Sequence, residues 1–199
     1  MTLAIKAVAI AWIALTAGTS ELHITPTVQL VSRSAAIKKI LAGSAKYFQR
    51  KAKLSKTETK LLKSRVGWAP EKRTAKLYVG RNADGNMVGT ATLLKVDSRH
   101  GPIVLAVGFE PDGSVKRVIV THATEESVTW VRTVIKSHFL DEFKTATSAT
   151  VDEHMAPASN LRPMPRYIAS VIARGVRRAL VLREVAFASY GVAAASDPE

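Results

Sequence analysis

The chain contains no cysteine among its 199 residues. It can therefore form no disulfide, thiolate metal site or iron–sulfur cluster, and it has no thiol nucleophile. Acidic residues are also few, because 16 Asp and Glu stand against 29 Lys and Arg, which gives a formal net charge of +13. Aromatic residues make up only 6% of the chain. This scarcity disfavours a nucleic-acid partner, because such surfaces interleave base-stacking aromatic rings with their cations.

Sequence patterns for metal binding and nucleophilic catalysis are missing as well. No two histidines are spaced as in a His-x-His or His-Glu-x-x-His motif, so spacing supplies no metal site. No nucleophile elbow is present, and the glycines near residues 80–89 do not follow a phosphate-loop pattern. The sequence therefore assigns no catalytic residue and predicts no substrate-converting activity.

Long apolar runs are limited to the N-terminus. Lys6 precedes the apolar stretch Ala7–Ala17, and the small residues Gly18–Ser20 follow it. A positive residue, a short apolar stretch and a small-residue exit are typical of a secretory signal, and the stretch is shorter than the ~20 residues that span a bilayer. We predict a signal peptide or an uncleaved signal anchor over residues 1–20, and hence a periplasmic or otherwise exported protein. A buried strand or helix of the mature fold is the alternative.

Apolar residues are plentiful, at 47% of the chain, which suits one globular domain with extra segments. Residues 33–81 hold about half of all Lys and Arg but only two acidic residues. Ser32 is placed to cap a helix that runs to about Leu41, and Ser55–Glu58 fits a capping box. We expect a basic helical segment over residues 28–70, a core domain over residues 71–188 and a flexible tail over residues 189–199.

The core domain begins with strand-like patterns separated by tight turns. Turns are predicted at Asn82–Gly85 and Pro111–Gly113, where glycine permits positive φ. The expected strands are Lys76–Arg81, Asn86–Val96, Pro102–Phe109 and Val115–Thr121. Helical spacing follows at Glu125–Phe139 and Arg166–Phe187. The sequence thus predicts an α+β fold in which an antiparallel sheet of about four strands packs against C-terminal helices.

A sequence resemblance covers most of this region. The segments Val88–Ala91, His100–Gly113 and Val115–His122, followed by Glu125 or Glu126, lie in the order and spacing of the FMN-binding domain family, whose members read "GPI–hydrophobic–VGIDPDG" at this point. Phe139–Phe143 is similar to the family's "FLxQF". The family includes periplasmic flavin subunits of electron-transport complexes. The resemblance implies an exported protein that binds FMN and serves electron transfer or an accessory flavin role.

The family's flavin-attachment motif is not intact in this chain. Members carry a Gly-Ala-Thr motif before the last helix, and in many the Thr bears FMN through a phosphoester. Aligned without gaps, Arg166 stands at the Thr position; with a short insertion, Ser159 does. Covalent attachment is therefore not expected, and Ser159 is its single plausible acceptor. In non-covalent binding Arg162 and Arg166 are candidate phosphate ligands, and solvated loop arginines are the alternative.

Three further residues are candidates for the flavin region. Glu125 and Glu126 correspond to an acidic residue that lies near the flavin region in the family, although capping of a helix start is by itself sufficient to account for them. His100 precedes the most apolar strand. Trp130 either stacks on a flavin ring or packs in the core.

The basic segment needs a partner or a solvation role of its own. A concentrated positive surface attracts polyanions over long range. For an exported protein we expect a redox partner protein, such as a membrane complex, or an anionic membrane surface. The competing hypothesis is a flavin-free binding module that docks through this basic face on a membrane or an acidic protein, and simple solubility remains a third account of the charge.

Overall fold

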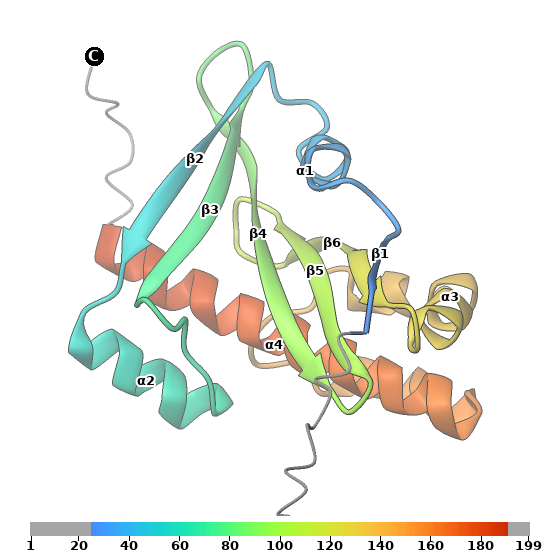
Figure 1. Cartoon of the computed structure of the whole chain (residues 1–199). Helices are drawn as coiled ribbons and strands as arrows, with labels where there is room; N and C mark the ends of the chain where they lie inside the picture. Colours follow the sequence, from blue (N-terminus) through green and yellow to red (C-terminus); the bar gives the residue numbers. More distant parts are fainter. Residues whose placement is uncertain (1–24, 191–199) are drawn as a thin grey trace, which may run out of the picture.

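The computed structural model describes residues 25–190, with side chains to residue 187 (Figure 1). The predicted signal over residues 1–20 lies outside the described residues. Of the predicted tail, residues 189 and 190 belong to the last helix, and the remainder also lies outside the described part.

Six strands form one antiparallel sheet, so the predicted α+β class is confirmed with more strands than the four expected. The predicted strands are β3 to β6, and two unpredicted strands, β1 and β2, are added at the two edges. The spatial order is β1-β6-β5-β4-β3-β2. The strands are β1 (Thr27–Gln29), β2 (Lys46–Lys53), β3 (Thr74–Arg81), β4 (Met87–Ser98), β5 (Gly101–Phe109) and β6 (Val115–Thr124). Gly85 and Gly113 have positive φ in the two predicted turns.

The basic segment contains two helices with strand β2 between them, so it is not helical throughout. The helices are α1 (Arg33–Ile40) and α2 (Lys56–Val66). The capping box of α2 is confirmed, because Ser55 Oγ accepts from the Glu58 amide at 3.1 Å while the Ser55 amide donates to the Glu58 carboxylate at 2.6 Å. Residues 46–53 are extended because they pair with β3, which buries Ala52.

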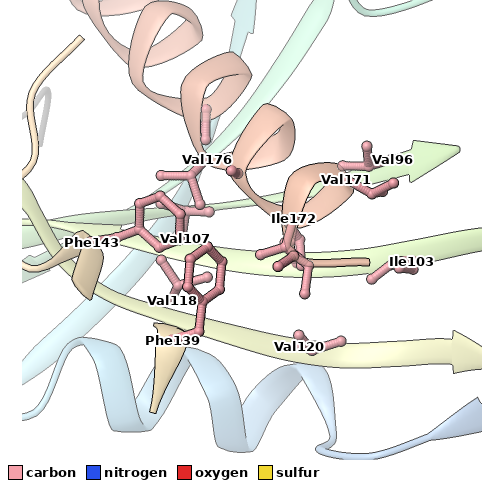
Figure 2. Packing of buried hydrophobic residues seen from close by; sticks show 14 of the residues in the cluster. Val96, Ile103, Val107, Val118, Val120, Phe139, Phe143, Val171, Ile172 and Val176 are labelled. Carbon is pink, nitrogen blue, oxygen red and sulfur yellow. The ribbon is translucent and has the colours of Figure 1, made fainter. Parts of the chain in front are cut away.

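One long helix covers the main face of the sheet. Helix α4 (Pro163–Tyr190) lies across β4 and β5, and Gly175 allows the close approach, because a Cβ there would lie 2.4 Å from Leu105 Cδ1. Figure 2 shows Ile172 and Val176 of α4 pointing into the same buried cluster as the phenylalanines of η1 (Phe139–Phe143). Between β6 and α4 the chain also forms α3 (Val128–Lys136) and η2 (Glu153–Asn160).

The opposite face of the sheet is covered in part by α1. Ile37 and Ile40 of α1 pack on Ala91 and Ala106, and the absence of a side chain at Gly108 makes room for Ile40. On the α4 side of the sheet, a second and smaller apolar cluster lies beside the main one. It joins α2 and the strands β2 and β3 to the C-terminal half of α4. Helix α4 therefore contributes to both clusters on its side of the sheet.

Candidate functional site

Three segments distant in sequence meet at the end of the sheet where β4 turns into β5. These are the turn at Arg99 and His100, the β6–α3 connection, and the first turn of α4. The Arg99 amide donates a hydrogen bond to Tyr167 Oη at 2.8 Å, and Thr124 Oγ1 donates to the His100 carbonyl. Thr124 and Ser127 are buried with their hydroxyl oxygens 2.9 Å apart. These bonds hold the β4–β5 turn against α4 and against the segment that leads into α3.

Within this junction His100 and Glu126 form a close pair. His100 Nδ1 lies 2.6 Å from Glu126 Oε1, and the side chains are 23% and 51% exposed. An ionised carboxylate only accepts hydrogen bonds, so in this pair Nδ1 is the donor.

Two aromatic rings surround the imidazole of His100. The Trp130 ring from α3 contacts it edge-on with centroids 4.8 Å apart, and the Tyr167 ring from α4 lies edge-on at 6.1 Å. Arg99 places its guanidinium 5.8 Å from the Tyr167 ring centroid. We call His100, Glu126, Trp130 and Tyr167 the His100 cluster. It combines a hydrogen-bonding pair with two half-buried rings, both of which also pack against the main apolar cluster.

The predicted helix start at Glu125 is wrong, because α3 begins at Val128. Glu125 and Glu126 precede the helix and carry no capping role. The Glu125 amide instead donates to the Pro26 carbonyl at 2.8 Å, next to β1, and its side chain is exposed. The physical reason for the shift is that β6 continues to Thr124, in register with Thr27 of β1.

The candidate phosphate residues lie around the junction of η2 and α4. Ser159 and Arg162 are exposed, whereas the Arg166 guanidinium is bound to backbone carbonyls. Its Nη2 donates to the Ser159 carbonyl at 2.5 Å and to the Leu161 carbonyl at 2.8 Å. Arg166 thus fastens the end of η2 to the start of α4. The structure does not join these residues to the His100 cluster by any direct side-chain contact within the described part of the chain.

The start of α4 is a poor cradle for a phosphate group. Anion binding at a helix start depends on free backbone N–H groups. Pro163 and Pro165 have none, and the Arg166 amide already donates to the Arg162 carbonyl at 2.9 Å. The amide of Met164 is the one donor left in the first three residues of the helix. A flavin phosphoester on Ser159 does not fit, since Ser159 stands at the carbonyl end of η2.

Other classes of site find little support between residues 25 and 190. No group of three or more His, Asp or Glu side chains is arranged to hold a metal ion there. In the same range, every helix is too short or too polar to cross a membrane.

Sequence reasoning named His100, Glu126 and Trp130 but missed Tyr167, Thr124 and Arg99. A usable signal existed for Tyr167, because it is an aromatic residue in the first turn of the strongest predicted helix. The roles of Thr124 and Arg99 depend on the turn geometry, which no local pattern reveals.

Comparisons with models of known protein families, with curated proteins and with solved structures found no match for this chain.

Proposed function

We propose that this chain is an exported FMN-binding-domain protein with an electron-transfer or accessory flavin role, and that it binds FMN without a covalent bond. The observation that carries the proposal is the His100 cluster. Two residues expected at the flavin region, His100 and Glu126, come from separate segments and meet at 2.6 Å beside two aromatic rings. Bound FMN would supply the redox chemistry, and the protein would hold and orient it.

The residues divide into a ring end and a phosphate end. At the ring end the flavin would contact the exposed parts of Trp130 and Tyr167, which are half-buried, and the His100 imidazole offers a hydrogen-bonding group. At the phosphate end Arg162 is the candidate ligand, because it is exposed and Arg166 is held by carbonyls. With one arginine and one helix amide for the phosphate, we expect weak, reversible binding.

Titration of the purified exported chain with FMN tests this function. We expect quenching of flavin fluorescence, heat stabilisation by FMN, and an intact mass without added flavin after denaturation. Trp130→Ala should weaken binding about tenfold, equivalent to about 1.4 kcal/mol. His122→Ala, a histidine on β6 outside the cluster, is the matched control and should bind as the original does. A chain that neither quenches FMN nor is stabilised by it refutes the assignment.

A second candidate function is a flavin-free module that docks through its basic face on an anionic membrane or an acidic protein. The specific observation in its favour is the proline-containing start of α4, which removes the amides that a phosphate would need. Three exposed lysines of α2 at positions i, i+4 and i+7, all without an acidic partner within 4 Å in the described part, form what we call the basic face: Lys56, Lys60 and Lys63.

Sedimentation with anionic lipid vesicles tests the membrane version of this second function. We expect co-sedimentation that decreases as salt is raised, because screening weakens exposed charges. Lys60→Glu with Lys63→Glu should reduce it, while Lys136→Glu on α3 should not. Binding of neutral vesicles to the same extent would contradict an electrostatic docking role.

A further inference from the structure

Strand β2 is the long open edge of the sheet. It pairs with β3 on one side and ends the strand order, whereas the opposite edge is the three-residue β1. In Figure 1 β2 lies at the left margin of the sheet, with α2 below it. An eight-residue edge strand presents a row of backbone groups to which another extended chain can pair.

The ladder with β3 shows which residues face the open side. The Leu54 amide donates to the Arg73 carbonyl at 2.7 Å, in register with the pairs Lys53↔Thr74 and Ala52↔Ala75. Antiparallel ladders alternate between bonded and non-bonded pairs, so even-numbered residues of β2 bond to β3. The backbone groups of Tyr47 and Gln49 consequently point to the open edge.

The charge on this edge selects the kind of strand that can join it. Residues 46–53 read KYFQRKAK, with four cations and no acid, and the three lysines of the basic face follow in α2. Pairing with a second copy of β2 would place cations opposite cations, which destabilises a sheet. An acidic strand would replace that repulsion with attraction and gain a fast, steered association.

Tyr47 adds an apolar contact to the charged edge. Its side chain is 40% exposed, and its partner on β3 is Gly80, over which Ser44 packs. The facing position on an added strand would lie beside the exposed part of this aromatic ring, and aromatic cross-strand pairs stabilise sheets. Backbone pairing, charge and one aromatic contact converge on the same edge.

We propose that the edge of β2 binds an acidic, extended segment of another protein as a seventh strand. The proposal deepens the docking role of the second candidate function and rests on it, and it names the partner chemistry as an acidic peptide rather than a lipid surface. Main-chain hydrogen bonds give such strand addition its affinity, and side chains give it specificity.

The peptide experiment measures fluorescence anisotropy with a labelled eight-residue probe of alternating Glu and Val, added to the full chain. The control probe has proline in place of each Val, which keeps the charge and removes strand pairing. We expect the proline probe to bind at least about tenfold more weakly, a difference of about 1.4 kcal/mol. Equal binding of both probes overturns strand addition and leaves charge attraction alone.

Variants on the protein side locate the site. Gln49→Pro removes an amide that faces the open edge and leaves the β3 ladder intact, as proline tolerates such edge positions; it should weaken binding at least tenfold, and Gln49→Ala should not. Lys46→Glu with Lys53→Glu should also abolish binding, with Lys136→Glu as control.

Slower hydrogen exchange at Tyr47 and Gln49 on adding the probe supports the proposal without any variant. Vesicle binding without probe binding refutes strand addition and preserves the docking role.

Discussion

At the residue scale, the turn between β5 and β6 contains a carboxylate whose titration can be predicted. Asp112 Oδ1 accepts from both the amide and the hydroxyl of Ser114, each at 2.8 Å. These two donors stabilise the charged form and hold the pKa of Asp112 below its ordinary 3.8, with a smaller contribution from Arg183. Because the folded-state pKa is lowered, the carboxylate stabilises the fold above about pH 4 and loses that effect as pH falls through the folded-state pKa.

The measurement is an NMR titration of the Asp112 carboxyl carbon. Ser114→Ala removes one of the two donors, so the titration midpoint should move upward toward 3.8. In parallel, the stability advantage of the original chain over Asp112→Asn should shrink below about pH 4. A midpoint that does not move in Ser114→Ala would show that the hydroxyl plays no part.

The sequence allowed single residues of the candidate site to be named, but it did not predict the contacts between them. His100 and Glu126 could be named from the resemblance, but their contact depends on a two-residue turn after β4 and on the extension of β6 to Thr124. Arg166 was predicted as a phosphate ligand, and in the structure its guanidinium donates to the Ser159 and Leu161 carbonyls. A guanidinium suits a carbonyl as well as a phosphate, so residue type alone could not choose between them.

At the scale of single elements, the capping box gives a direct stability prediction for α2. Ser55→Ala removes the acceptor for the Glu58 amide, and loss of such a cap costs about 1 kcal/mol. Thr57 is exposed and is the second residue of α2, so Thr57→Ala is the control. It should change the free energy of unfolding by less than about half as much as Ser55→Ala does. Urea denaturation monitored by circular dichroism measures both. Equal stability of Ser55→Ala and the original chain would contradict a role for the cap.

The contact of α4 with the sheet depends on Gly175. A methyl group there would lie 2.4 Å from Leu105 Cδ1 and 2.6 Å from Val96 Cγ2. Alanine improves helix propensity by about 1 kcal/mol, but overpacking costs about 1–3 kcal/mol. Since both neighbours are fully buried, we expect Gly175→Ala to lower the free energy of unfolding by about 1 kcal/mol. A thermal melt measures it, and Arg174→Ala on the exposed side of the same helix should show no loss.

Elements with strong local patterns were predictable, and those defined by pairing were not. The turns at Gly85 and Gly113 and the helix Arg166–Phe187 carry clear glycine or 3.6-residue signals, and the structure contains all three. Strand β2 reads locally as a lysine-rich surface segment, because only Ala52 and Leu54 are buried near its end. Its strand conformation comes from β3, which lies beyond α2 in sequence. Strand β1, with three residues, is too short to give a pattern.

At the scale of the whole molecule, the two apolar clusters on one side of the sheet share α4 and should unfold together. Trp130 packs on the larger cluster and Trp68 on the smaller one. With Trp12 replaced by Phe, the variants Trp68→Phe and Trp130→Phe each leave one reporter. We expect their fluorescence transitions to coincide in denaturant, as for a single cooperative unit. Separate midpoints would show that the region around α2 unfolds independently.

The position of α4 in chain order has a consequence for biogenesis. The six strands and the helices α1 to α3 are all synthesised before α4, so the face of β4 and β5 that packs on α4 lacks this cover until the helix emerges. During synthesis the nascent chain must therefore expose this sheet surface, or remain unfolded, until α4 has been made. A chaperone that holds the chain in an unfolded state would act in that interval, and its release would be followed by collapse of both clusters onto α4.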